Sequence, residues 1–313
     1  MPRIDVHTHF LPDDYRAALV AVNPALTRLP DCSTEALLSM MERFQIDAAI
    51  VSLSPPGVFH GDPGKALDLA RTVNDYAAGL RRTHPDRFAT LGVIPLPDVA
   101  ASLDEIRRCR DELDLDGFEV FTNVAGTYLG NPRWDPVLAE LDARRAYVFV
   151  HPVSPPYPAP LMSFPDWLFE FPFESTRAIV NLIYAGCFER FPNIRFHFAH
   201  LGGAAVFLAH RIASLATRNP ELAVGAPAGA IRHLQTLYLD TAQADSSIAL
   251  SAALELSPVD RMVFGTDWPY AALPTEGSDP APGLAALDAH TRERVLGVNA
   301  LALVPRLAAA AWR

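Results

Sequence analysis

The chain has 313 residues, half of them hydrophobic, and a formal net charge of −10 at neutral pH. This hydrophobic fraction supports a large core and argues against a disordered protein. The acidic balance, without a block rich in Lys and Arg, argues against nucleic-acid binding, because phosphates need clustered positive charge. The sequence contains no run of roughly 18 apolar residues, so it predicts no membrane-spanning helix. The length fits two ordinary domains or one (β/α) barrel.

The cysteines and the first residues of the chain indicate the cellular compartment of the protein. Cys32, Cys109 and Cys187 are far apart, odd in number and outside any paired motif. This pattern indicates reduced thiols rather than a disulfide framework or a sulfur-ligated zinc site. Met1-Pro2-Arg3 leads directly into an expected strand, without the features of a signal peptide. We therefore expect a cytoplasmic protein that binds neither nucleic acid nor membrane.

Short apolar runs rich in β-branched and aromatic residues alternate with longer amphipathic segments. The expected strands span residues 4–9, 48–53, 88–95, 117–122, 147–151, 195–200, 237–241 and 262–266. The expected helices include residues 34–44, 63–82, 100–113, 134–144, 175–191, 204–216 and 246–256. This alternation is typical of parallel βαβ units. Eight units without a Gly-x-Gly-x-x-Gly loop after the first strand favour a single-domain (β/α)8 TIM-like barrel over a doubly wound sheet.

Two longer connections interrupt this alternation. Residues 152–172 contain seven prolines together with Met162, Phe164, Trp167, Phe169 and Phe171. Long loops in compact domains are usually functional, so we interpret this loop as a lid, although a surface cover at the barrel edge would look similar. Residues 218–230 are rich in Ala, Pro and Gly and are expected to form a plain connection.

Polar residues gather where the expected strands end. Four of the ten histidines stand at carboxyl ends of strands, namely His7, His9, His151 and His200, and Asp267 follows the eighth strand. The active sites of (β/α)8 barrels are built from these strand ends. We therefore expect strands one, five, six and eight to direct these side chains into one cavity.

Residue spacing predicts a metal site here. His7 and His9 lie two residues apart in a strand, so their side chains face the same side, about 6 to 7 Å apart. Imidazole nitrogens suit Zn²⁺, Mn²⁺ or Fe²⁺. Together with His151 and Asp267 they would leave room for water or substrate, as a catalytic site requires. The alternative is that the histidines are core residues satisfied by hydrogen bonds.

His200 is expected to have another role. It precedes Leu201 and two glycines that allow a tight turn or close approach of a ligand. A histidine beside a metal-bound water is suited to general acid–base catalysis, although it could instead bind a second metal. His197 has the opposite strand parity and is expected to face the outer helices. Asp5 and Asp240 are expected to support ligands or cap helices.

At these residues the sequence resembles the amidohydrolase superfamily, specifically the branch of aminocarboxymuconate semialdehyde decarboxylase and aromatic-acid decarboxylases. The matching segments are Asp5-Val6-His7-Thr8-His9, Val150-His151-Pro152, His200-Leu201-Gly202-Gly203 and Gly265-Thr266-Asp267-Trp268-Pro269. They span almost the whole chain in the family's order. Residues 131–152 and 171–211 look most like 6-methylsalicylate decarboxylases.

The resemblance implies a distorted barrel with one divalent metal, Zn²⁺ first and Mn²⁺ as the alternative. Its ligands would be His7, His9, His151 and Asp267, and His200 would act on the metal-bound water or the substrate. Many binuclear relatives carry a carboxylated lysine on strand four. Residues 117–122 contain no lysine, which favours a mononuclear site, although Glu119 could bridge.

The implied reaction is non-oxidative decarboxylation of a small aromatic or muconate-like carboxylic acid, with the carbon protonated by His200 or Asp267. Candidate substrate contacts are Phe164, Trp167, Phe171 and Trp268, which could stack on a ring or simply pack in the core. Arg211 matches an arginine that in relatives can reach a neighbouring subunit's site, which implies a homodimer, but it could equally be a surface charge. The alternatives are hydrolysis of a lactone or amide, a hydratase, or a metal-binding barrel without catalysis.

Overall fold

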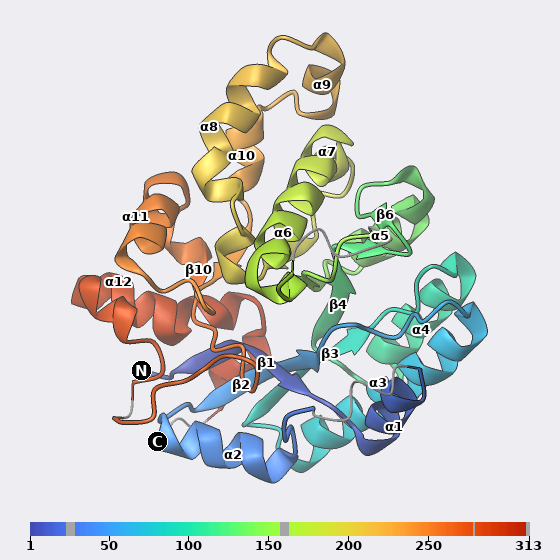
Figure 1. Cartoon of the computed structure of the whole chain (residues 1–313), viewed down its shortest axis with the longest axis vertical. Coiled ribbons are helices and arrows are strands. Elements are labelled where there is room, and N and C mark those ends of the chain that lie inside the picture. Colours follow the sequence, from blue (N-terminus) through green and yellow to red (C-terminus); the bar gives the residue numbers. More distant parts are fainter. Residues whose placement is uncertain (23–28, 157–162, 278, 311–313) are drawn as a thin grey trace.

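The computed structural model describes residues 1–22, 29–156, 163–277 and 279–310. Eight parallel strands follow one another around a barrel in chain order (Figure 1). They are β1 (Ile4–Phe10), β2 (Ala48–Leu53), β3 (Phe88–Val93), β4 (Gly117–Phe121), β7 (Tyr147–His151), β8 (Arg195–Phe198), β9 (Tyr238–Asp240) and β10 (Met262–Val263). The predicted (β/α)8 barrel is therefore confirmed.

The barrel closes between β1 and the segment that follows β10. The backbone N–H of Val6 donates to the carbonyl of Phe264 at 2.9 Å, and the N–H of Asp267 donates to the carbonyl of His7 at 2.7 Å. Further along, the N–H of His9 donates to the carbonyl of Trp268 at 2.9 Å. Closure thus places Asp267 directly beside the two histidines of the first strand.

Helices surround the barrel and form its outer layer (Figure 1). They are α1 (Asp13–Val22), α2 (Thr34–Arg43), α3 (Pro63–Thr83), α4 (Val99–Asp111), α5 (Asp135–Ala143), α6 (Asp166–Tyr184), α7 (Cys187–Arg190), α8 (Ala205–Ala216), α9 (Pro220–Gly225), α10 (Ala230–Leu234), α11 (Ser247–Leu256) and α12 (Ala289–Glu293). Ser33 and Ser246 cap α2 and α11 by accepting backbone N–H groups, at 3.2 and 3.3 Å. In the described part of the chain, none of the helices could cross a membrane.

The two longer connections differ from expectation. Helix α6 begins at Asp166, so the segment 166–172 is helical and Pro172 lies inside the helix. The proline removes one backbone donor, but its carbonyl accepts from the Thr176 hydroxyl at 2.7 Å, and the helix buries a continuous face. Residues 157–162, including Met162, lie outside the described residues. The connection 218–230 contains α9, whose first turn is capped by Asn219.

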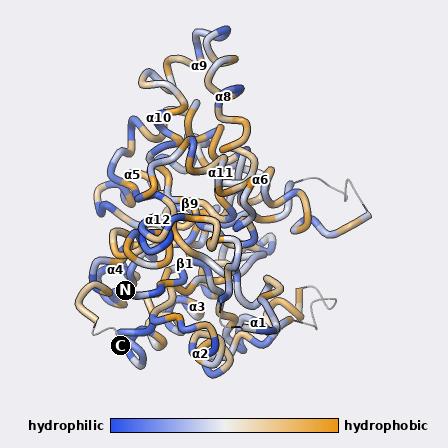
Figure 2. The backbone as a smooth tube through the Cα atoms, turned by 90° about the vertical axis from the view of Figure 1, so that its left-hand side faces the viewer, coloured by the Kyte–Doolittle hydropathy of each residue, from blue (hydrophilic) through white to orange (hydrophobic). Residues whose placement is uncertain are grey.

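Apolar side chains fill both layers of the fold. The inner cluster at the amino ends of the strands includes Ile4, Val6, Ile50, Leu91, Tyr147, Phe149 and Val263. The pairing of β1 with β2 changes register between Asp5 and Thr8. Val6 packs in the inner cluster, and the ring of His7, the next residue, also lies inside the barrel, with its centroid 4.9 Å from that of Phe149. The barrel interior is therefore apolar at one end and carries histidines at the other. Figure 2 shows α8, α9 and α10 projecting beyond the barrel.

Candidate metal centre

Three histidines and one aspartate converge at the carboxyl end of the barrel. His7 and His9 come from β1, His151 ends β7, and Asp267 follows β10. One donor atom from each residue lies within 4.8 Å of the others, and all four residues are buried. The Nε2 atoms of His7 and His9 are 3.2 Å apart, and Asp267 Oδ1 lies 3.4 and 3.1 Å from them. The structure therefore brings together the four residues that the sequence predicts as ligands.

The free nitrogen of His151 indicates what this cluster can hold. Its Nδ1 lies 2.7 Å from the carbonyl of Pro152 and must donate a hydrogen bond to it. In the neutral ring Nε2 is therefore unprotonated and carries a lone pair. This Nε2 is buried and has no hydrogen-bond partner. A buried polar atom without a partner is costly, and a cation among these four donors would satisfy it. Three imidazole nitrogens and one carboxylate fit a divalent metal such as zinc or manganese.

A buried chain of hydrogen bonds orients His7. Its Nδ1 lies 3.0 Å from Asp240 Oδ2, which is also 2.9 Å from His197 Nε2. Since an ionised carboxylate only accepts, both histidines donate to it, and the Tyr147 hydroxyl donates to His197 Nδ1 at 2.9 Å. Asp240 Oδ1 accepts the backbone N–H of His200 at 3.0 Å. Nε2 is therefore the nitrogen of His7 that faces the metal centre, and it can act as a ligand once it has lost its proton.

The expectation for His197 is wrong. The residue pairs in register with Phe149, its ring stacks on that residue at 4.5 Å, and its side chain is buried inside the barrel. Strand β8 ends at Phe198, and His200 has a positive φ of 55°, so strand parity cannot be counted back from His200. The supporting role expected for Asp240 agrees with its contacts.

The protonation of the centre follows from its charges. Burial favours a neutral His7, but Asp240 and Asp267 outweigh it and raise its pKa to about 10. Burial lowers the pKa of His9 and lowers that of His151 well below its usual value, so both are neutral at neutral pH. Burial opposes ionisation of Asp267, yet the charge on His7 and hydrogen bonds from His200, His7 and His9 hold its pKa well below the usual range. A proton on His7 thus occupies the place that a metal cation would take.

His200 stands at the edge of the four donors. Its Nε2 lies 3.5 Å from Asp267 Oδ2, and its side chain remains partly exposed. Positive φ angles continue from His200 through Leu201 to Gly203. A Cβ on Gly203 would lie 1.9 Å from the carbonyl oxygen of Pro172, so only glycine fits there. This turn presents the imidazole to the metal centre while its backbone is held by Asp240.

Two residues at the site were not predicted from the sequence. The side-chain amide of Gln243 donates to Asp267 Oδ2. The ring of Tyr270 lies 5.6 Å from that of His9, and its hydroxyl is 2.8 Å from Ser54 Oγ. Gln243 comes three residues after Asp240, at the carboxyl end of β9, so the rule that located the histidines would also have found it.

The expected substrate contacts lie at different distances from the centre. Phe171 is half-buried, with its ring centroid 6.2 Å from that of His151, and Trp268 is half-buried next to Asp267. Phe164 and Trp167 are 39% and 63% exposed at the start of α6. Arg211 lies exposed on α8.

Glu119 does not belong to the four-residue cluster. It is fully buried on β4, and burial raises its pKa well above the usual range. The described geometry thus favours a single metal.

The family model described as Amidohydrolase matches residues 4–306, so the chain belongs to the amidohydrolase family. It is 32% identical over 318 residues to 6-methylsalicylic acid decarboxylase acuB from Aspergillus aculeatus, covering 97% of this chain and 96% of that protein. It is 28% identical over 331 residues to 2-amino-3-carboxymuconate-6-semialdehyde decarboxylase from Dictyostelium discoideum, covering 96% and 90%.

Solved structures share the whole fold. The crystal structure of an amidohydrolase II superposes with a TM-score of 0.88 at 28% identity, over 97% of this chain and 99% of that one. A dihydroxybenzoic acid decarboxylase from Polaromonas sp. JS666, crystallised with manganese and the inhibitor 2-nitroresorcinol, gives a TM-score of 0.84 at 22% identity, over 97% of each chain. At 22% identity, the similarity to the Polaromonas enzyme shows a shared fold and no more.

Replacing Asp240 with Asn should weaken metal binding by about 10- to 100-fold. An amide at this position can donate to His7 Nδ1, which moves the ring proton to Nε2 and removes a ligand lone pair. The dissociation constant is measured by competition with a chromophoric chelator. Asp98→Asn, at the exposed cap of α4, is the matched control and should bind metal normally. Unchanged affinity in a folded Asp240→Asn variant would show that this hydrogen bond does not position His7.

Metal binding should release about one proton per site at pH 7 to 8. His7 has a pKa of about 10 in the metal-free protein and must lose its proton to become a ligand. Lowering the pH therefore strengthens proton competition, and affinity should fall about tenfold per pH unit below this pKa. Calorimetry in buffers of different ionisation heat measures the release. Mn²⁺ is the probe, because zinc-bound water itself can lose a proton near neutrality. Affinity independent of pH between 7 and 8.5 would contradict the assignment.

Proposed function

We propose that this protein is a metal-dependent decarboxylase of a small aromatic or muconate-like carboxylic acid. The convergence of His7, His9, His151 and Asp267 on one centre beside His200 carries this proposal. Relatives named as decarboxylases align over nearly the whole chain. We propose zinc as the ion, since nitrogen-rich tetrahedral sites suit it. Manganese, which is bound in a structure of the same fold, is the alternative.

The ion, when bound, would act as a Lewis acid and a template for the substrate carboxylate and a neighbouring oxygen. Loss of CO₂ would leave an electron pair on carbon, and protonating that carbon before the C–C bond breaks avoids a free carbanion. His200 Nε2 and Asp267 Oδ2 lie 3.5 Å apart. We propose that one of these two residues delivers the proton. Asp240 holds the backbone of His200 and so fixes where the proton is presented.

Aromatic side chains are proposed to enclose the substrate ring. Phe171 is the best placed, since its ring stands against His151, and Trp268 follows Asp267 directly. Phe164 and Trp167 are proposed as outer contacts from the amino end of α6, within the segment that we interpret as a lid. Aromatic pairs prefer edge-to-face or offset geometry, which suits a planar substrate beside Phe171.

His7→Ala should abolish metal binding, whereas His200→Ala should keep the metal and lose turnover by about 100-fold or more. The native protein should contain about one metal per chain and release CO₂ from a hydroxybenzoic acid. Metal analysis and CO₂ release are measured on the same samples. His210→Ala, at an exposed position on α8, is the matched control.

Full activity of His200→Ala would refute its role in proton transfer. Metal binding without CO₂ release, combined with ring opening of a lactone or cleavage of an amide, would identify a hydrolase instead. Addition of water to the substrate would identify a hydratase. Failure to bind metal after reconstitution would refute the proposed function as a whole.

We infer that the protein forms a homodimer through α8 and α11, with Arg211 directed at the partner's site. Phe207 on α8 and Ile248 on α11 are 84% and 83% exposed, and these two helices pack side by side. Exposed apolar side chains in such proximity are typical of interfaces. Phe207 and Arg211 are four residues apart in one helix and share a face. The family resemblance supports the role of Arg211.

Phe207→Glu should convert the dimer to a monomer, because a charge on each subunit would be buried at the contact. Sedimentation velocity measures the change. Val224→Glu, at a position 82% exposed on α9, is the matched control and should leave the dimer intact. Arg211→Ala should lower kcat/KM without changing the metal content. A monomeric native protein would contradict the inferred dimer.

We also infer a cytoplasmic location. Cys32, Cys109 and Cys187 are free and buried. Burial raises the pKa of Cys32 to about 12 and that of Cys187 to about 11, so both remain protonated thiols at neutral pH. Such thiols are poor nucleophiles and are typical of proteins from reducing compartments.

A further inference from the structure

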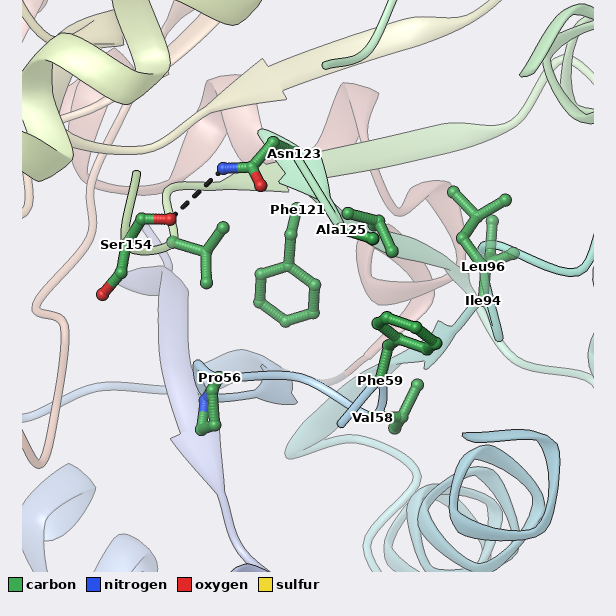
Figure 3. A pocket seen from close by; sticks show the side chains of 11 residues that line it. Pro56, Val58, Phe59, Ile94, Leu96, Phe121, Asn123, Ala125 and Ser154 are labelled. Carbon is green, nitrogen blue, oxygen red and sulfur yellow. Dashed lines mark hydrogen bonds between the residues drawn. The ribbon is translucent and has the colours of Figure 1, made fainter. Parts of the chain in front are cut away.

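A cavity lined mainly by apolar side chains lies at the carboxyl ends of β2, β3, β4 and β7 (Figure 3). Its volume is about 200 Å³, and its walls include Phe59, Leu96, Phe121 and Val124. A cavity of about 150 Å³ is large enough for benzene, so this one can hold a ring with a small substituent. None of the described residues that line it carries a charge.

Phe121 connects this cavity to the metal centre. It pairs in register with His151, and the centroids of the two rings lie 6.4 Å apart. A Cβ on Gly57, which has a positive φ of 77°, would lie 2.5 Å from the Phe121 ring, so the loop after β2 presses directly on this ring. The chain after His151 supplies Val153 and Ser154 to the same cavity. The cavity and the metal centre thus share a border at Phe121 and at the chain that follows His151.

The hydrogen bonds of Asn123, on the polar wall of the cavity, determine which way its side-chain amide is oriented. Asn123 Nδ2 donates to Glu174 Oε2 at 2.9 Å and to the carbonyl of Ser154 at 3.3 Å. Glu174 also accepts from the Tyr128 hydroxyl at 2.6 Å and from Arg177 at 2.8 Å, so it acts as an acceptor of three donors. This network assigns the amide nitrogen to the Glu174 side. The amide oxygen accordingly faces the cavity, as Figure 3 shows.

We propose that this cavity is the subsite for the ring substituent and selects substrates with a single carboxylate. The inference rests on the proposed decarboxylase function and narrows it to monocarboxylic aromatic acids with an alkyl or hydroxyl group on the ring. A hydroxyl can donate to Asn123 Oδ1, and a methyl group can pack against Leu96 and Phe121. A second carboxylate would lose its water against apolar walls and face the Asn123 carbonyl oxygen without a cation to pair with.

The test compares three acids on the metal-loaded enzyme: 2-hydroxy-6-methylbenzoate, 2,6-dihydroxybenzoate and 2-hydroxyisophthalate. The first two should be decarboxylated with a kcat/KM about 100-fold or more above that of the dicarboxylate. Val124→Trp fills the cavity and should lower kcat/KM at least tenfold with the metal retained. Val224→Trp, on the exposed surface of α9, is the matched control and should have no effect.

Asn123→Leu keeps the size of the side chain but removes the acceptor. Its effect should be selective, reducing the preference for the hydroxyl-bearing acid over the methyl-bearing acid by about tenfold. General misfolding would instead lower both rates alike. An unchanged ratio in this variant would overturn the role of Asn123, and equal or better turnover of 2-hydroxyisophthalate by the native enzyme would overturn the subsite while leaving the decarboxylase function in place.

Binding of 3-methylphenol tests the cavity without turnover. This neutral ring should bind the metal-loaded protein, measured by NMR titration. Val124→Trp should abolish binding of 3-methylphenol, and Val224→Trp should preserve it. Binding that depends on Val124 in a protein without decarboxylase activity would refute the proposed function but support the subsite. Absence of binding, or binding unaffected by Val124→Trp, would overturn the subsite.

Discussion

Backbone hydrogen bonds between β1 and the segment after β10 hold the barrel closed and assemble the metal centre at the same time. The N–H of Asp267 donates to the carbonyl of His7 at 2.7 Å, and the N–H of His9 donates to the carbonyl of Trp268 at 2.9 Å. Asp267 has a positive φ of 59°, which a non-glycine residue adopts only when its surroundings enforce it. The Asp267 carboxylate is thus positioned by the interaction that completes the fold, and breaking these hydrogen bonds would separate it from both histidines.

Two buried carboxylates, Asp240 and Asp267, differ at the metal centre in the partners of their hydrogen bonds. Both oxygens of Asp240 are occupied, Oδ2 by His7 and His197 and Oδ1 by the backbone N–H of His200. Asp240 is therefore placed to orient His7 and His200, the proposed metal ligand and proton donor, rather than to bind metal itself. Asp267 instead directs Oδ1 at the Nε2 atoms of His7 and His9. The positive charge that both carboxylates require comes from the proton on His7 when no metal is bound.

Sequence patterns predicted the barrel and the convergence of the four donors because both depend on local signals. Uninterrupted apolar runs placed β2 and β7 with the observed limits, and the histidines stand at strand ends that any barrel brings together. Three-dimensional contacts decided the rest. The inward position of His197 depends on where β8 ends. The start of α6 depends on packing that tolerates Pro172.

Helix α6 contacts three parts of the site: His151, the turn that carries His200, and the cavity wall at Asn123. Phe171 stands against His151, and the carbonyl of Pro172 packs against Gly203 in the turn that presents His200. One turn further, Glu174 fixes the amide of Asn123 at the cavity. The barrel positions the four donors of the candidate metal centre, whereas this one helix contacts both the turn that carries His200, the proposed proton donor, and the proposed subsite. Changes in this helix and in the loops it contacts would therefore alter the substrate preference while leaving the metal donors in place.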